Sequence, residues 1–294
     1  MSKQVILLTG ATGFLGSEVA KALVNNGHQV VIIKREQSDL KRLDSIKHLC
    51  SYYNVDDLQL AFSENKIDTI IHTATSYGRK GESEEDVLNA NLVFPFILLQ
   101  CALRNNVKKF INTGTALNAY TNAYSLSKHQ FSNWLNFYQK SLCICEVILE
   151  YFYGPGDDSW KFVTMVFEKI MKEEPFIEFT SGMQKRDFIY ISDVVSAFVS
   201  LVNSNFPKGM HSFPLGSGNP VTIKELVYQC SKIANNNKTE LKFGSLPDRA
   251  LETDNIVCNT SMLKEIGWTD KIGLEEGLEI TWQYYLSKND KNVS

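Results

Sequence analysis

Tyr124 and Lys128 stand four residues apart in a segment, residues 123–140, whose composition predicts a helix. Side chains at i and i+4 lie on one face of a helix, so both would point into the same site. A tyrosine hydroxyl titrates near pH ~10 in model compounds, and a neighbouring ammonium lowers that pKa by stabilising the phenolate. Such a pair can exchange a proton with a substrate oxygen near neutral pH. Alone, the Y-x-x-x-K spacing is common by chance and mostly marks a surface face.

Thr113-Gly114-Thr115 follows a short strand-like run at residues 110–112, just upstream of this pair. A hydroxyl at the end of that strand can hold a carbonyl oxygen beside Tyr124. Thr115 is the predicted catalytic hydroxyl, and Thr113 is the alternative. Thr115, Tyr124 and Lys128 together make a candidate site for proton transfer to a ketone or alcohol oxygen.

Three glycines with the spacing G-x-x-G-x-x-G, Gly10, Gly13 and Gly16, follow the first strand, at residues 5–9. The first permits a tight turn, the second lets the backbone approach a pyrophosphate, and the third allows close packing of a helix on the strand. The following helix offers free N–H groups to the phosphates at its start. The sequence therefore predicts dinucleotide binding by this turn, which also contains Thr12, Phe14 and Leu15.

The residues after the second strand, at 30–33, indicate which dinucleotide binds. Enzymes that use NAD place an acid there for the ribose 2′-hydroxyl. This chain has Lys34 and Arg35 instead, and two cations attract a 2′-phosphate, which arginine can bind bidentately. We therefore expect NADP(H), although Glu36 is an acid close by and both cations are also compatible with a solvated strand end.

The elements that would position these residues alternate along the first half of the chain. Strands are expected at 5–9, 30–33, 69–73, 110–112 and 145–150, and helices at 14–26, 86–105 and 123–140, with Pro95 predicting a kink. Alternation of this kind predicts an α/β fold, a doubly wound parallel sheet of the Rossmann type. Beyond Tyr151 we expect helices at 162–172, 192–202, 222–233 and 273–286, and a polar, frayed tail from Ser287.

Length and composition limit the classes of protein. The chain has 294 residues, enough for one large domain or for one domain with a smaller lobe. Its formal net charge is -3, so no global electrostatic argument favours nucleic acid or an anionic membrane. No secretory signal or uninterrupted apolar stretch of about 18 residues is visible. Six scattered cysteines lack metal-ligand spacing, so we expect reduced thiols, no metal and a cytoplasmic protein.

Taken together, the motifs resemble those of extended short-chain dehydrogenases/reductases of the nucleotide-sugar type. The resemblance covers residues 5–286. It rests on the turn T-G-A-T-G-F-L-G at 9–16, on I-H-T-A-T at 71–75, on Asn91, on Y-x-x-x-K at 124–128, on Y-G-P at 153–155, on R-D-F-I-Y-I-S-D at 186–193 and on L-G-S-G at 215–218. It implies a nicotinamide-binding Rossmann domain over 1–150, to which later segments return, and a smaller C-terminal α/β lobe over 151–294 for the nucleotide sugar.

The resemblance also implies roles for residues by position. Residues 72–75 (His72, Thr73, Ala74 and Thr75) would lie along the cofactor. Asn91 would be the helix residue that supports the active-site strand, and Lys128 would also hydrogen-bond the nicotinamide ribose. The residues implied on the substrate side are Tyr77, Lys161, Arg186 and Arg249.

The aromatic residues of the helix after Tyr124 fit either the core or an interface between two copies of the chain. They are Phe131, Trp134, Phe137 and Tyr138. In the family this helix often joins a dimer bundle, so the resemblance implies a homodimer.

Two departures narrow the reaction that the resemblance implies. The family's 4,6-dehydratases carry Asp-Glu after the catalytic threonine, whereas this chain has Ala116-Leu117, which argues against dehydration. Its 4-epimerases usually keep NAD bound and carry an acid after the second strand. Within the family, the chain resembles the CDP-abequose and CDP-paratose synthases in motifs such as I-I-H-T-A-T-S-Y-G at 70–78 and Q-K-R-D-F-I at 184–189, but Glu150 and Tyr151 replace the usual residues before Y-G-P.

We therefore expect NADPH-dependent reduction of the C4 ketone of a CDP-, dTDP- or GDP-linked 4-keto-6-deoxyhexose. Such a reaction belongs to deoxysugar biosynthesis for surface polysaccharide, as in the O-antigen of lipopolysaccharide. The alternatives are a nucleotide-sugar 4-epimerase with tightly bound NAD and a non-catalytic NADP-binding redox sensor. The intact Tyr124 and Lys128 argue against the sensor.

Overall fold

The computed structural model describes residues 3–248 and 257–293, which fall into two compact units. The first unit comprises Met1–Leu149, Val195–Leu215 and Ser261–Trp268, and the second comprises Glu150–Val194, Gly216–Thr260 and Thr269–Ser294. The chain thus passes from the first unit to the second and back more than once, and each unit is described by itself below.

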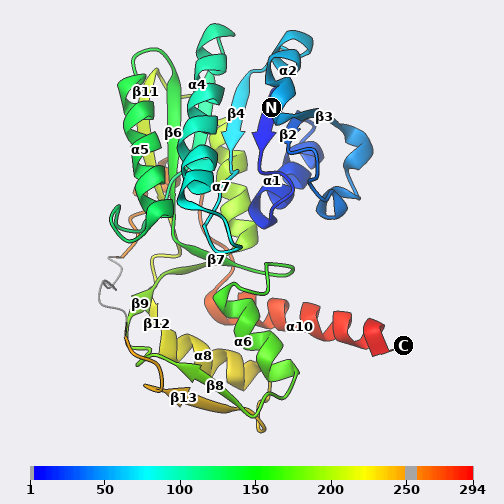
Figure 1. Ribbon diagram of the computed structural model, residues 1–294, viewed down its shortest axis with the longest axis vertical. Coiled ribbons are helices and arrows are strands. Elements are labelled where there is room, and N and C mark those ends of the chain that lie inside the picture. Colours follow the sequence, from blue (N-terminus) through cyan, green and yellow to red (C-terminus); the bar gives the residue numbers. More distant parts are fainter. Residues whose placement is uncertain (1–2, 249–256, 294) are drawn as a thin grey trace. The chain divides into compact units, whose positions relative to one another are not determined.

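A seven-stranded parallel sheet is the frame of the first unit (Figure 1). Its order is β11-β6-β5-β4-β1-β2-β3. The strands are β1 (Val5–Thr9), β2 (Gln29–Lys34), β3 (Cys50–Asn54), β4 (Thr69–His72), β5 (Lys109–Thr113), β6 (Cys143–Leu149) and β11 (Gly209–Leu215). The predicted α/β fold with a doubly wound parallel sheet is confirmed.

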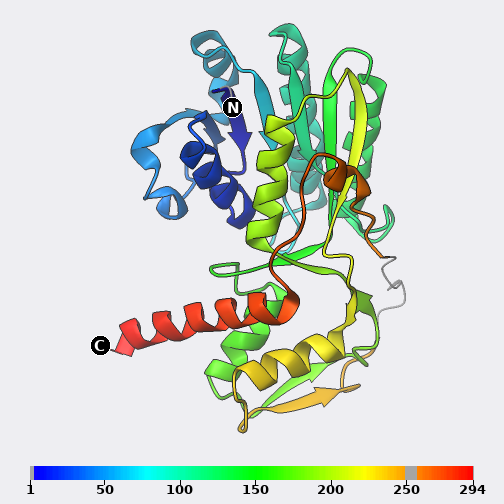
Figure 2. The ribbon, with the colours of Figure 1, turned by 180° about the vertical axis from the view of Figure 1, so that it is seen from behind.

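Helices cover both faces of this sheet, which is why its central strands are buried along almost their whole length and are mainly apolar. Alternate strand residues such as Leu7, Ile70 and Phe110 pack with buried residues of α2 (Leu58–Glu64), α4 (Phe94–Arg104) and α5 (Ala123–Phe137). On the opposite face lie α1 (Phe14–Asn25) and the part of α7 (Ile191–Asn203) that belongs to the first unit (Figure 2). Short 3-10 turns at Lys41–Leu43, Lys47–Leu49 and Val55–Asp57 flank β3, and α9 (Ser261–Glu265) packs beside β11.

The strand order reverses between β1 and β4, both of which are central to the sheet. In doubly wound sheets, ligands bind outside the carboxyl ends of the strands at such a reversal. The glycine turn follows β1, Lys34 ends β2, residues 73–75 follow β4, and Thr115 follows β5. Because these strands are parallel, all of these residues lie at the same edge of the sheet.

Two strands of the sheet, β3 and β11, were not predicted from the sequence. Both are at an edge of the sheet. β3 is half-buried and partly polar, and β11 contains Gly209 and Pro214, which are typical of loops. Proline, which has no backbone N–H, is tolerated in an edge strand because one side of that strand has no neighbour that would accept a hydrogen bond.

The predicted kink near Pro95 takes the form of a π-helical turn. The segment expected at 86–105 consists of α3 (Glu84–Leu88), the π-helix η4 (Asn89–Val93) and α4, with Pro95 in the first turn of α4. The wider turn accommodates a residue that cannot donate to the helical ladder. By length and composition alone, this stretch, Glu84–Arg104, is long and apolar enough to cross a membrane. However, Leu98, Leu99 and Ala102 of α4 are buried in the core against the sheet.

The second unit combines short strands with three longer helices. Its strands are β7 (Tyr151–Tyr153), β8 (Phe176–Phe179), β9 (Lys185–Arg186), β10 (Phe188–Tyr190), β12 (Val221–Thr222) and β13 (Glu240–Phe243), which pair as β7 with β10, β8 with β13 and β9 with β12. Its helices are α6 (Phe162–Met171), α8 (Ile223–Ile233) and α10 (Leu274–Val293). The capping box predicted at Thr222 and Glu225 is present. The frayed tail predicted from Ser287 is helical instead, because α10 continues to Val293, although most residues of this last stretch are weak helix formers.

Candidate active site

The glycine turn after β1 is built so tightly that two of its glycines leave no room for a side chain. Gly10 has a φ of +75°, and a Cβ there would lie 2.5 Å from the backbone nitrogen of Ala74. A Cβ on Gly16 would collide with the carbonyl oxygen of Gly10. Gly13 begins α1 without any side-chain cap. Thr12, Phe14 and Leu15 therefore sit at a helix start whose backbone N–H groups are available to an anion, as a pyrophosphate requires.

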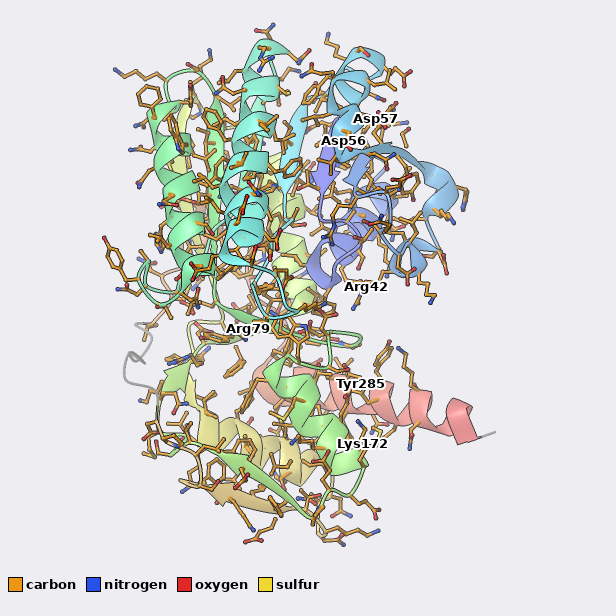
Figure 3. All side chains as sticks on the ribbon, viewed as in Figure 1. Arg42, Asp56, Asp57, Arg79, Lys172 and Tyr285 are labelled. Carbon is orange, nitrogen blue, oxygen red and sulfur yellow. The ribbon has the colours of Figure 1, made fainter. Side chains whose placement is uncertain are left out.

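The basic residues after β2 differ in their contacts within the protein. The Lys34 ammonium donates to the carbonyl oxygens of Arg35 and Glu36 and to the side-chain oxygen of Asn54, at 3.3–3.4 Å. Arg35 is exposed. A further arginine, Arg42, lies beside the start of α1, with its guanidinium carbon 5.8 Å from the centre of the Phe14 ring (Figure 3). Arg42 was missed in the sequence, because nothing in the spacing of residues 36–42 indicates that the chain turns back towards α1.

Asn91 joins the loop after β4 to the helix that carries the tyrosine. It is fully buried in η4. Its side-chain oxygen accepts hydrogen bonds from the Thr75 hydroxyl and the Ser76 N–H, and its amide donates to the carbonyl of Ser76 and the hydroxyl of Ser127. Thr73, which precedes this loop, donates its hydroxyl to the Thr9 carbonyl. Residues 73–76 are thereby held against both the glycine turn and α5.

Tyr124 lies in the first turn of α5, whose start is fixed by a capping box. The Asn122 side chain accepts from the Ser125 N–H, and the Ser125 hydroxyl accepts from the Asn122 N–H. Tyr124 is half-buried, and its ring lies 4.8 Å from that of Tyr77, centre to centre. Tyr77 therefore borders the predicted acid directly, although the two residues are far apart in the sequence.

Thr113 and Thr115 are both buried, but their hydroxyl groups are used differently. Thr113 donates its hydroxyl to the His72 carbonyl. The Thr115 hydroxyl oxygen accepts from the Leu117 N–H at 3.3 Å, and this is the hydrogen bond that the described residues make with it. The loop that carries Thr115 contacts α5, because the His129 ring bonds to the Leu117 carbonyl and the Ser125 hydroxyl donates to that of Ala119.

Lys128 is the most buried of the predicted catalytic residues, at 2% exposure. Its ammonium nitrogen has no hydrogen-bond partner among the described residues. Burial lowers the pKa of Lys128 to about 8, against the charge of the buried Glu146, which raises it. Glu146, on β6, was also missed in the sequence. The pattern of a buried strand does not reveal which of its residues lies close to a helix such as α5. An unpartnered buried ammonium and the glycine turn both fit a bound dinucleotide.

In the second unit, Arg186 is buried on β9, next to a fully buried acid. Its Nε donates to the Tyr151 hydroxyl at 3.2 Å, and its Nη1 donates to the Lys185 carbonyl at 2.7 Å. The neighbouring Asp187 accepts from the N–H and hydroxyl of Ser217 and from the N–H of Gly218. Because Asp187 lies between β9 and β10, these bonds hold residues 216–218, the loop after β11, against the two strands.

The remaining substrate-side residues of the prediction are spread over the second unit. Lys161 precedes α6, with its ammonium 4.4 Å from the centre of the Trp160 ring. Arg249 lies outside the described residues. Glu150 is partly buried, and its pKa is raised to about 7 by burial and by Asp187, against the effect of Arg186. Among the residues that the structure describes, no group of three or more His, Cys, Asp or Glu side chains could hold a metal ion.

A sequence model of the NAD dependent epimerase/dehydratase family matches residues 6–211, which extend from β1 into β11 and so reach every strand of the sheet. The chain belongs to this family. The glycine turn, Asn91 and the Tyr124–Lys128 pair all fall within the matched region.

Curated relatives match over nearly the whole chain. CDP-abequose synthase of Salmonella muenchen is 29% identical over 284 residues, which is 93% of this chain and 95% of the relative. dTDP-4-dehydro-6-deoxyglucose reductase of Escherichia coli is 25% identical, over 94% of this chain and 96% of the relative. The resemblance predicted from the motifs is confirmed at the level of the family and of its similarity to CDP-abequose synthases.

Solved structures share the fold of the whole chain. The UDP-glucose 4-epimerase of Thermotoga maritima, in a complex with UDP-glucose, aligns with a TM-score of 0.84 and 22% identity over 97% of this chain and 99% of its own. The UDP-glucose 4-epimerase of Thermus thermophilus, in a complex with NAD, aligns with a TM-score of 0.81 and 22% identity over 96% and 99%. At this identity the likeness concerns the fold.

Proposed function

We propose that the protein is an NADPH-dependent reductase of the C4 ketone of a nucleotide-linked 4-keto-6-deoxyhexose. The observation that carries this proposal is the combination of a complete Tyr124–Lys128 site with basic residues, rather than an acid, after β2. The similarity to CDP-abequose synthase and to a dTDP-4-dehydro-6-deoxyglucose reductase supports a nucleotide sugar as substrate.

The preference for NADPH rests on the charges near the end of β2. Lys34 is tied to backbone carbonyls, so its positive charge is fixed at the strand end. Arg35 is exposed, and Arg42 lies against Phe14 at the start of α1. Arginine binds phosphate bidentately, and these three cations would hold the 2′-phosphate beside the adenosine ribose. The pyrophosphate would lie on the glycine turn.

The mechanism follows from the roles that the geometry allows. A bound NADPH supplies the hydride for the C4 carbonyl carbon. Tyr124 donates its proton to the carbonyl oxygen as negative charge develops on it, and Thr115 donates a hydrogen bond to the same oxygen. Lys128 would supply positive charge near Tyr124 and would donate to the ribose, a role that suits an ammonium without a partner among the described residues. Positioning and stabilisation of the oxyanion supply most of the acceleration.

The second unit would bind the nucleotide sugar. Arg186 has the charge and the planar donor set that a pyrophosphate requires, and Tyr151 and the Lys185 carbonyl hold its orientation. Lys161 and Arg249 are proposed to assist it, and Tyr77 to contact the sugar beside Tyr124. Ala116 and Leu117 follow Thr115 where a dehydratase needs an acid and a base, so simple ketone reduction is the chemistry that these residues suit.

The test is consumption of NADPH, followed by absorbance, with CDP-, dTDP- and GDP-linked 4-keto-6-deoxyhexoses. We expect turnover with one of them, a preference for NADPH over NADH of at least about tenfold, and loss of about 10³-fold or more of kcat in Tyr124→Phe. Arg35→Ala and Arg42→Ala should each raise the KM for NADPH and leave that for NADH unchanged.

Two results would contradict this proposal. Absence of turnover with all three substrates would reject the reductase in its present form. NAD that stays bound through purification, with interconversion of C4 epimers and no net consumption of NADPH, would favour the second candidate, an epimerase. That candidate has support from the similarity of the sequence to the UDP-glucose 4-epimerase of Caenorhabditis elegans, which is 24% identical over 98% of this chain.

A further inference from the structure

The Lys128 ammonium is shielded from solvent and lacks a hydrogen-bond partner among the described residues. The residue is 2% exposed, and its nitrogen is unpartnered among the described residues. Transfer of an unpaired ammonium from water into such a site is costly, so a buried lysine tends to lose its proton. The charged form of Lys128 therefore requires a compensating negative charge nearby.

Three titratable groups face Lys128 from the elements around it. His72, at the end of β4, and Glu146, on β6, are close enough to Lys128 for an electrostatic interaction, and Tyr124 lies one turn earlier on the same helix. His72 is fully buried, and burial followed by the charge of Lys128 lowers its pKa well below the usual value. His72 is therefore neutral, with its Nδ1 bonded to the Thr9 hydroxyl at 2.7 Å, and it offers Lys128 no negative charge.

Glu146 is the buried carboxylate of this group, at 4% exposure. The Ser132 hydroxyl donates to its Oε2 at 2.7 Å, and the Asn112 amide donates to its Oε1 at 3.3 Å. Ser132 is four residues after Lys128, so it lies on the same face of α5. Together these two hydrogen bonds fix the position of the carboxylate between α5 and β5.

The Glu146 side chain is closely packed by its neighbours. A Cβ on Gly114, the residue between Thr113 and Thr115, would lie 3.3 Å from its Oε1 and from its Cγ. The carboxylate thus touches the backbone that presents Thr115 as well as the helix that presents Lys128. Its charge raises the pKa of Lys128 against the effect of burial, which would otherwise take the lysine further below its value of about 8.

We propose that Glu146 is a positioning residue that keeps Lys128 protonated and fixes the face of α5 on which it lies. The proposal rests on the proposed function, which assigns to Lys128 the contact with the nicotinamide ribose. Glu146 would act through Lys128 and touch neither cofactor nor substrate. Replacement by the neutral and nearly isosteric glutamine should therefore change the pH at which the site works rather than its structure.

The experiment is the pH dependence of NADPH binding, followed by fluorescence, in the wild type and in Glu146→Gln, with Glu85→Gln, a change at an exposed acid of α3, as the control. Wild-type affinity should weaken as the pH rises past the pKa of Lys128. In Glu146→Gln the weakening should begin at a pH lower by roughly one unit or more, because an adjacent opposite charge is worth at least that much. The control should follow the wild type.

A second comparison identifies Lys128 as the group through which Glu146 acts. Lys128→Met should bind NADPH weakly without this pH dependence, and adding Glu146→Gln to it should cause no further change in the pH profile. A merely structural role would lower affinity at all pH values and leave the midpoint in place. Circular dichroism checks the fold of each variant. If Glu146→Gln does not fold, Glu146→Asp is used instead, because its side chain is one methylene shorter and moves the carboxylate away from Lys128.

An unshifted midpoint in the folded variant overturns the proposal, even if the wild type reduces a sugar substrate. Conversely, a shifted midpoint supports it even if none of the sugars is reduced, because binding needs only the cofactor. If NADH binds in place of NADPH, the same titration is made with NADH, and only the cofactor preference in the proposed function fails.

Discussion

At the scale of single residues, the structure separates two threonines that the sequence leaves nearly equivalent. Thr113 ends β5 and donates its hydroxyl to the His72 carbonyl, so that hydrogen is already used. Thr115 accepts a hydrogen bond from the Leu117 N–H and makes no other hydrogen bond with the described residues. Its hydrogen is therefore available to a substrate oxygen, which favours Thr115 as the residue that stabilises the oxyanion.

Valine at each position is a matched pair of changes that tests this difference. Thr115→Val should lower kcat by about 10²-fold or more, the usual effect of removing one donor to an oxyanion, with little change in stability. Thr113→Val should instead lower the free energy of unfolding by about 1–2 kcal/mol, because the His72 carbonyl loses its donor. Steady-state kinetics and urea unfolding measure both, and the reverse pattern would make Thr113 the catalytic hydroxyl.

How far the site could be predicted depends on whether its residues follow a local pattern. Tyr124 and Lys128 share a helix, so their common face follows from the spacing alone. Glu146 reaches the same site from β6, and Arg42 reaches the start of α1 from a 3-10 turn. Such residues come close only through the order of the strands in the sheet and the path of the connecting segments. Neither can be predicted from the spacing of apolar residues along the chain.

At the scale of elements, the end of α7 depends on a buried lysine from β5. Lys109 is buried, and its ammonium donates to the carbonyl oxygens of Leu201, Val202 and Ser204. These carbonyls belong to the last turn of α7 and to the residue after it, where a helix has acceptors without partners and a partial negative charge. Burial lowers the pKa of Lys109, but the bonds to three carbonyls offset the cost of its charge.

Lys109→Met should therefore lower the free energy of unfolding by about 2–4 kcal/mol, since the Leu201 and Ser204 carbonyls lose this donor. The Val202 carbonyl, in contrast, keeps a hydrogen bond from Gln4. The adjacent Lys108 is the natural control, because its side chain is 78% exposed and pairs with Asp68 at the surface. Lys108→Met should cost less than about 1 kcal/mol, as is usual for an exposed ion pair. Equal losses of stability in thermal or urea unfolding would show that the hydrogen bonds from Lys109 to the end of α7 contribute little to the free energy of unfolding.

The longer helices could be predicted because their apolar residues repeat with the helical period, and the central strands because they are short, mainly apolar runs buried on both faces. The edge strands β3 and β11 lack that signal, since only part of each is buried and β11 contains Pro214. They belong to the sheet because neighbouring strands offer them hydrogen bonds, for example β6, which pairs with β11 from Gly209 to Leu215. The course of α10 beyond Ser287 was missed because its polar residues suit a solvated helix as well as a frayed tail.

At the scale of the whole molecule, α4, η4 and α5 present large apolar side chains to solvent. Trp134 and Phe137 of α5 are 41% and 72% exposed, and Val93 and Ile97 on the neighbouring helical stretch are also exposed. The two stretches are in contact, since the rings of Phe96 and Trp134 lie 4.8 Å apart. Contiguous apolar residues on adjacent helices are typical of an interface between proteins.

We expect this surface to join two copies of the chain, so that the protein sediments as a homodimer of 33.3-kDa chains. An interface related by a twofold axis uses the same surface on both copies, so one substitution introduces two charges into it. Phe137→Glu should therefore shift the protein to monomers at micromolar concentrations in sedimentation velocity. Tyr228→Glu, at an exposed aromatic residue on α8 in the second unit, should leave the dimer intact. A monomeric wild type, or a dimer that tolerates Phe137→Glu, would place the association surface elsewhere or exclude it.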